Sequence, residues 1–235
     1  MLSSLAVVGP QGWGPLLLQA AGMTLAVSVC AFVLGLALGA VGASARLSRS
    51  RLARGAAETY TTVVRGVPDL LIIYLFYFGG SQVLTSLAHA FGGAGFFGLP
   101  AFLVGTLAVG IVSGAYQTEL LRGAFGAIPR GELEAARAVG MGKLLMLRRI
   151  TAPLVLRTAL PGMGNIWQQV IKESALISVT GLVELLRQVT VGAGSTRQPF
   201  VFYIAGTVLY LVLTTVSGFA FRGAEFWTAR GMRRA

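Results

Sequence analysis

The stretch GPLLLQAAGMTLAVSVCAFVLGLALGAVG, residues 14–42, decides the class of fold. It carries no charged side chain, and a helix of about 20 apolar residues is long enough to cross the hydrocarbon core of a bilayer. Residues 70–118 and 200–221 also lack Asp, Glu, Lys and Arg. Only 11% of the 235 residues are charged, against roughly 25% in a soluble domain. The sequence therefore predicts an all-α integral membrane protein.

Five transmembrane helices are expected, and residues 1–235 are interpreted as a single transmembrane domain. The predicted spans are residues 14–42, 58–87, 100–127, 153–179 and 199–221. The fourth span is unusually polar, because it contains Asn165, Gln168, Gln169, Lys172 and Glu173. A helix of this kind should face a water-filled cavity or another protein rather than lipid.

Small residues recur at every fourth position of the first span: Ala31, Gly35, Gly39 and Ala43. This spacing allows two helix backbones to approach closely within a membrane. The partner helix could belong to the same subunit or to a neighbouring one.

Basic residues predict the orientation of the chain. Most Lys and Arg fall in three clusters, at 46–54, 122–157 and 222–234. Clusters of this kind mark cytoplasmic segments. They share one side if the N-terminus is outside and the C-terminus inside, which an odd number of spans requires. We therefore expect a multi-pass protein of the bacterial cytoplasmic (inner) membrane. Its basic residues are expected to lie near membrane lipid and not to bind nucleic acid.

Residue types that perform catalysis are not clustered in the sequence. The single Cys30 excludes a disulfide within the chain, and His89 stands alone near an outer helix end. No spacing of His, Cys and carboxylates predicts a metal or catalytic site, which argues against a membrane-embedded enzyme. The pattern Gly-x4-Gly-Lys-Ser/Thr, which binds nucleotide phosphates, is also absent from the sequence. ATP hydrolysis is therefore not expected in this chain.

Residues 129–152, between the third and fourth spans, form the predicted cytoplasmic loop. Glu134 lies near the start of a first short helix, whose positive end favours carboxylates. Gly140 should end this helix. A second short helix, Lys143–Ile150, is expected to stop before Pro153, because the residue before a proline is disfavoured in the α conformation. Two short helices at the membrane surface would make a compact docking element.

The run Glu134-Ala135-Ala136, followed by Gly140, Ile150 and Pro153, resembles the "EAA…G…I-x-L-P" loop of ABC importer permeases. Ala152 stands where that pattern usually has Leu. In this family the loop is a helix seated in a cleft of the ATPase subunit. The resemblance therefore implies that the six residues couple this chain to a partner ATPase, which would bind ATP and Mg.

The likeness covers nearly the whole chain. Three further segments resemble the polar amino-acid branch of these permeases, which transports histidine, lysine–arginine–ornithine or opines: Arg65–Leu70, Gly114–Ala124 and Ala159–Asn165. Membership implies a partner permease, either homologous or a second copy of this chain. It also implies two ATPase subunits and a periplasmic or extracellular solute-binding protein. The expected substrates are arginine, lysine, ornithine, histidine or an opine.

Ionisable side chains at membrane depth mark either a transport pathway or an ion pair. Glu119 should lie roughly 15 Å inside the helix that ends at Pro129. Its carboxylate could bind the cationic group of a basic substrate. A structural ion pair with Arg122, three residues along the same helix, explains Glu119 equally well.

The fourth span contains a second candidate, Glu173, together with three polar neighbours: Asn165, Gln169 and Ser174. Glu173 could contact substrate, or it could pair with Lys172 or with a basic residue of a partner subunit. Asp69, which follows Pro68 in the second span, could line the pathway or have a structural role.

Two alternative functions remain open. A stand-alone secondary carrier or channel for small polar solutes would need no nucleotide, but it leaves the pattern from Glu134 to Pro153 unexplained. An importer for neutral or acidic amino acids would share the whole architecture and would not need the carboxylates at membrane depth.

Overall fold

A computed structural model describes residues 12–92, 95 and 98–229, and every regular element in these ranges is helical. The elements in chain order are α2 (Gly14–Arg46), α3 (Arg51–Gly66), α4 (Asp69–Tyr74), the π-helical η1 (Leu75–Gly79), α5 (Gly80–Ala90), α6 (Ala101–Gly126), α7 (Arg130–Ala138), α8 (Lys143–Met146), the π-helical η2 (Leu147–Thr151), α9 (Ala152–Ser174), the 3₁₀-helical η3 (Ala175–Thr180), α10 (Leu185–Thr196) and α11 (Pro199–Ala229). The all-α prediction is confirmed.

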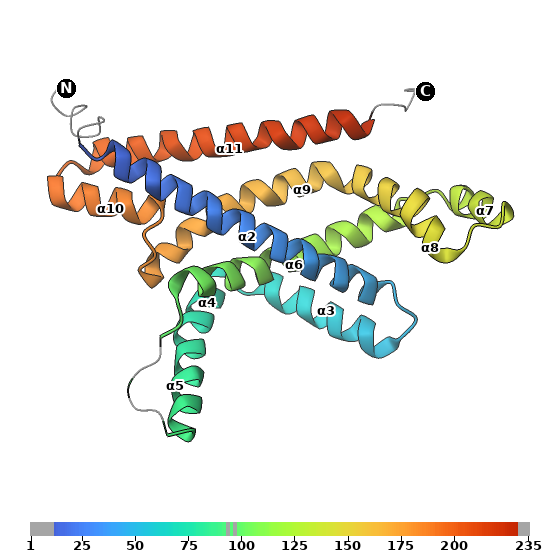
Figure 1. The fold of residues 1–235 in the computed structure, drawn as a ribbon, viewed down its shortest axis with the longest axis horizontal. Coiled ribbons are helices and arrows are strands. Elements are labelled where there is room, and N and C mark those ends of the chain that lie inside the picture. The colour runs from blue at the N-terminus through green and yellow to red at the C-terminus, as the bar shows by residue number, and fades with distance from the viewer. Residues whose placement is uncertain (1–11, 93–94, 96–97, 230–235) are drawn as a thin grey trace.

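The long helices α2, α6, α9 and α11 run roughly along one axis, and α2 crosses α6 and α9 (Figure 1). The main hydrophobic core lies where α2, α4, α6, α9 and η3 meet. Its buried side chains are Val27, Ala31, Ile72, Ile73, Ala108, Val109, Val112, Ile166, Val170 and Ile177. The central helix of this core is α6, which therefore positions the polar side chains of α4 and α9 around it.

Glycines allow α2 and α6 to pack closely. A Cβ atom placed on Gly39 would lie 2.7 Å from the Cβ of Gln117 and 3.1 Å from its carbonyl carbon. A Cβ on Gly35 would lie 2.7 Å from the hydroxyl of Ser113. The partner helix of these small residues is therefore α6 of the same subunit, and not a helix of a neighbouring one.

We expect Gly39→Ala to lower the free energy of unfolding by about 1–3 kcal/mol, because the backbone of α6 must move to admit the methyl group. Gly22→Ala is the matched control in the same helix, since a Cβ there meets no atom within 4 Å. Unfolding by denaturing detergent, followed by tryptophan fluorescence, measures both variants. Equal stabilities for the two variants would contradict this account of the packing.

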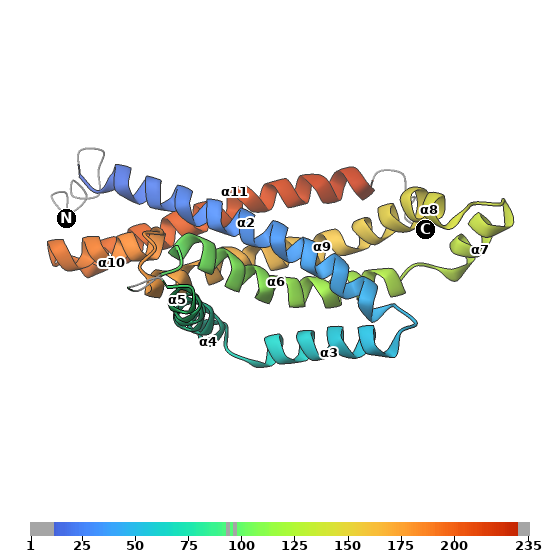
Figure 2. The same ribbon diagram turned by 60° about the horizontal axis from the view of Figure 1, so that its bottom comes forward.

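The predicted second span, 58–87, has the wrong boundaries. α3 ends at Gly66, the backbone is extended at Val67 and Pro68, and α4 begins at Asp69. Proline lacks an N–H and disfavours the helical conformation of the residue before it, so the helix breaks there. After the break, α4 and α5 leave the bundle at a steep angle (Figures 1 and 2). The helix long and apolar enough to cross a membrane in this region is Asp69–Ala90.

The predicted fourth span, 153–179, also differs from the structure. The helical path does not stop before Pro153 but continues from Lys143 to Thr180 through the π-helical η2. A wider π turn before the proline accommodates its missing N–H. The path then bends by 53° into α10. In the described ranges four helices are each long and apolar enough to cross a membrane, and the bent pair would make a fifth.

The α2–α3 connection, the α7–α8 loop and the C-terminal end of α11 lie at the same end of the bundle (Figures 1 and 2). The N-terminal end of α2 and helix α10 lie at the other end. The fold therefore brings the described basic clusters together, while Arg230, Arg233 and Arg234 lie outside the described residues. Which end is cytoplasmic remains a prediction.

Candidate functional site

The first short helix of the α7–α8 loop forms as predicted, whereas α8 is the first turn of the path that continues through η2 into α9. Glu132 lies in the first turn of α7, and the chain turns at Gly140, whose φ is +77°. The N–H of Met141 donates to the carbonyl of Ala136 over 3.1 Å, which closes the turn. Left-handed backbone at this position suits glycine, because a Cβ atom would approach the following carbonyl oxygen.

One of the six predicted coupling residues, Ala136, is not accessible on the surface of this loop. Glu134, Ala135, Gly140 and Pro153 are exposed, and Ile150 is half-buried. Ala136 is only 5% exposed, so it packs inside the loop and cannot present a side chain to a partner.

Two exposed apolar side chains were missed by the sequence analysis. Val139 is 73% exposed and Leu144 is 78% exposed, on either side of the glycine turn. The available signal was an apolar residue on each side of a Gly-x-Gly turn within a polar loop. Large apolar side chains exposed this far are typical of a surface that another protein covers.

Glu119 belongs to an ion-pair network at the same end of the bundle as the loop. Its Oε2 lies 2.7 Å from Nη2 of Arg122, and its Oε1 lies 3.4 Å from Nε of Arg46. Arg46 also contacts Glu58, at 2.7 Å. The network joins α2, α3 and α6, and it favours the structural interpretation of Glu119. The contacts of Arg46 connect distant parts of the sequence, so no local spacing predicted them.

Two carboxyl groups meet in the middle of the bundle. Glu173 is 7% exposed, and its Oε1 accepts a hydrogen bond of 2.6 Å from Nε2 of Gln169. Asp69, placed at the start of α4 by the Pro68 break, lies close enough to interact with Glu173. Among the described residues, neither carboxylate forms an ion pair. Lys172 is exposed, and the predicted pair with Glu173 does not form.

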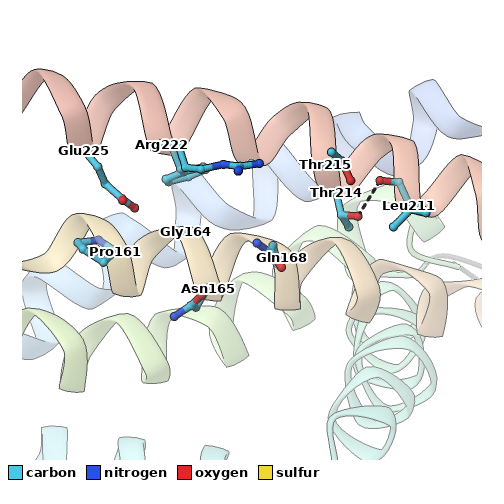
Figure 3. Close-up of a pocket in the computed structure, with 11 residues that line it drawn as sticks. Pro161, Gly164, Asn165, Gln168, Leu211, Thr214, Thr215, Arg222 and Glu225 are labelled. Atoms are coloured by element: carbon cyan, nitrogen blue, oxygen red, sulfur yellow. Dashed lines mark hydrogen bonds between the residues drawn. The ribbon is translucent and has the colours of Figure 1, made fainter.

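The remaining predicted pathway residues are divided between two places. The hydroxyl of Ser174 donates to the carbonyl of Ile171 over 2.7 Å and is buried in its own helix. Asn165 lies instead in a cleft of about 370 Å³ between α9 and α11, where Gln168 also lies (Figure 3). The polar fourth span thus faces a cavity, as expected.

The α11 side of this cleft was not foreseen. It contributes the polar side chains Thr214, Thr215, Arg222 and Glu225. Thr, Gly and charged residues recur every three or four positions from 211 to 225, a spacing that could have indicated one polar face of the fifth span. Arg222 thus belongs both to the C-terminal basic cluster and to this cleft.

Residues 31–227 match the model of the family described as "Binding-protein-dependent transport system inner membrane component". The chain belongs to this family. The permease is 57% identical to the octopine transport system permease protein OccQ of Rhizobium radiobacter over 232 residues, which cover 99% of this chain and 98% of OccQ. It is 39% identical to the histidine/lysine/arginine/ornithine transport system permease protein HisQ of Escherichia coli over 224 residues, covering 95% and 98%.

Structural comparison agrees with the sequence comparisons. The permease resembles a chain from the crystal structure of an amino acid ABC transporter with histidines, with a TM-score of 0.76 and 30% identity. The likeness covers 91% of this permease and 94% of that chain. The protein is therefore a permease subunit of an ABC importer, a membrane component rather than a catalyst, as the sequence predicted. The alternative of a stand-alone carrier is set aside.

Proposed function

We propose that this permease imports basic amino acids or opines, and that the acid pair Asp69–Glu173 binds the cationic group of the substrate. The observation that carries the proposal is the buried carboxylate of Glu173, which is held by Gln169 and has Asp69 nearby, with no cation paired to either carboxylate among the described residues. The names of the relatives, which refer to octopine and to histidine, lysine, arginine and ornithine, support it.

Electrostatics explains why such a pair suits a cationic substrate. Two like charges at close range disfavour each other, and Glu173 is buried as well. A guanidinium or ammonium group between them would relieve the repulsion and donate hydrogen bonds to both carboxylates. Gln169 fixes the orientation of Glu173 by its amide hydrogen bond. A neutral substrate would supply no such compensation, so the pair selects for positive charge.

In the assembled importer, the end of the bundle that carries α7 and α8 faces the cytoplasm. The N-terminus is then outside and the C-terminus inside a bacterial inner membrane. A periplasmic or extracellular solute-binding protein delivers the substrate, and a second permease, homologous or a copy of this chain, completes the channel. Two ATPase subunits bind ATP and Mg and contact the loop through Glu134, Ala135 and the turn at Gly140. Val139 and Leu144 would supply apolar contacts at the same surface.

The decisive experiment is ATP-driven uptake of labelled arginine by the complete importer in proteoliposomes. Glu173→Gln and Asp69→Asn keep the shapes of the side chains and remove their charges. Each should lower the initial rate at least about tenfold, because a hydrogen bond to a charged group contributes about 1.5–3 kcal/mol. Glu58→Gln is the control, since that carboxylate lies on exposed α3.

Unchanged arginine uptake in both acid-pair variants would refute the proposed role of the pair. Specificity for neutral or acidic amino acids would then become the better assignment. Uptake of labelled glutamine and glutamate by the unmodified importer measures that alternative directly.

A further inference from the structure

The cleft between α9 and α11 lies apart from the acid pair. Asn165 precedes Glu173 by eight residues on α9, which corresponds to about 12 Å along the helix. The cleft is therefore displaced from the acid pair toward the end of the bundle that carries α7 and α8 (Figure 1).

Two opposite charges face this cleft from α11. The guanidinium of Arg222 extends along α11 toward Thr215, and it lies 4.4 Å from the ring centre of Phe219. The carboxylate of Glu225 extends from α11 toward α9, on which Pro161 lies (Figure 3). Within the described part of the chain, neither Arg222 nor Glu225 forms an ion pair. Both residues lie just beyond the predicted span 199–221, where their charges can pair with a ligand that enters the cleft.

Neutral hydrogen-bonding groups line the same cleft as the two charges. Asn165 and Gln168 are exposed to the cleft from α9, and Thr215 is exposed from α11. Gly164 and Gly218 line the same cleft and leave space between the helices. The site thus combines a cation, an anion, and neutral donors and acceptors in one cleft.

We propose that this cleft is a second substrate site, which holds a basic amino acid apart from the acid pair. Arg222 binds the α-carboxylate, which a guanidinium can contact through two parallel hydrogen bonds. Glu225 binds the cationic side chain, and the amides of Asn165 and Gln168 contact the backbone groups of the substrate. The proposal rests on the proposed function in one respect, that the substrate is a basic amino acid or opine.

A cysteine at the cleft tests this site on the assembled importer. Thr215→Cys is made in a Cys30→Ser background, and its rate of reaction with a small water-soluble maleimide is measured in nanodiscs. At ten times its dissociation constant, arginine should slow the reaction roughly tenfold, because about one site in eleven is then free. Agmatine lacks the carboxylate and citrulline lacks the charged side chain, so both should protect less than arginine. Thr158→Cys, exposed on α9 one turn outside the cleft, should show no protection.

Second-site variants assign the roles of the two charges. Glu225→Gln and Arg222→Gln should each abolish protection by arginine, whereas Glu173→Gln should keep it. Protection that survives both cleft variants would overturn the proposal. A cysteine at position 215 that does not react at all would also overturn it, because a second permease would then cover the cleft.

The two proposals fail separately. If Glu173→Gln loses uptake but arginine does not protect the cysteine at position 215, the acid pair remains the proposed substrate site and the cleft proposal is refuted. Protection that depends on Arg222 and Glu225, together with normal uptake in Glu173→Gln, would support the cleft as a substrate site and refute that role for the acid pair.

Discussion

Replacing Gly140 with Val is expected to reduce ATP-driven uptake to the level of membranes without the importer. The φ of +77° at Gly140 is a conformation that β-branched residues avoid. Strain of this kind costs about 1–3 kcal/mol, and the backbone can relieve it only by changing the turn between α7 and α8. The exposed surfaces of Glu134, Val139 and Leu144 would then no longer fit one partner together.

A matched control for this change lies two residues away. Gly142 has a φ of −65° and an extended ψ, which valine adopts readily, and a Cβ there meets no atom within 4 Å. Gly142→Val should therefore keep most of the uptake. Co-purification of the ATPase and substrate-stimulated ATP hydrolysis should follow the same order. Equal activities of the two variants would show that the left-handed turn has no part in coupling.

Replacing Glu184 with Ala should lower the free energy of unfolding by about 3–5 kcal/mol. Glu184 is 1% exposed and lies at the bend between η3 and α10. Its Oε2 accepts from the hydroxyl of Tyr210 at 2.9 Å and from the N–H of Leu186 at 2.9 Å. Its Oε1 accepts from the N–H of Arg187 at 2.7 Å. Each buried donor left without an acceptor costs about 1–3 kcal/mol.

The loss should be concentrated where α2, α10 and α11 meet. Thr24 of α2 donates to Glu184 over 3.4 Å, and the same hydroxyl oxygen accepts from the N–H of Leu185 at 3.0 Å. Unfolding curves of Glu184→Gln, which keeps one acceptor oxygen, should fall between the unmodified protein and Glu184→Ala. Thr190→Ala, an exposed position on α10, serves as the control. A loss below about 1 kcal/mol in Glu184→Ala would refute the role of this network.

Helices bounded by local signals were predicted well. α6 spans Ala101–Gly126 against a predicted 100–127, because Pro100 and Pro129 lie close to its ends. Three of the other prolines have different effects on their helices. Pro68 breaks its helix, Pro153 follows a π turn, and Pro161 remains inside α9. Neighbouring helices can satisfy the groups that a proline frees, so tertiary packing decides between these outcomes.

The candidate sites show the same division between local and distant signals. The turn at Gly140 and the pair Glu119–Arg122 depend on residues close in sequence, and both were predicted. The proximity of Asp69 to Glu173 depends on how α4 packs against α9 and η3, so each residue was a candidate without a known partner. Glu184 was missed, because its partners come from α2 and α11 as well as from its own turn.

The polarity of α9 has a consequence for how the chain enters the membrane during synthesis. This region is apolar enough to count as a span only together with α10, across the bend. Charged side chains make the insertion of a helix less favourable, most strongly at its centre, and α9 carries the adjacent residues Lys172 and Glu173 near its C-terminal end. Its partition into lipid therefore depends on α2 and α6, which are synthesised first and cover its apolar side. The order of synthesis thus supplies the surface that makes insertion of the fourth span favourable.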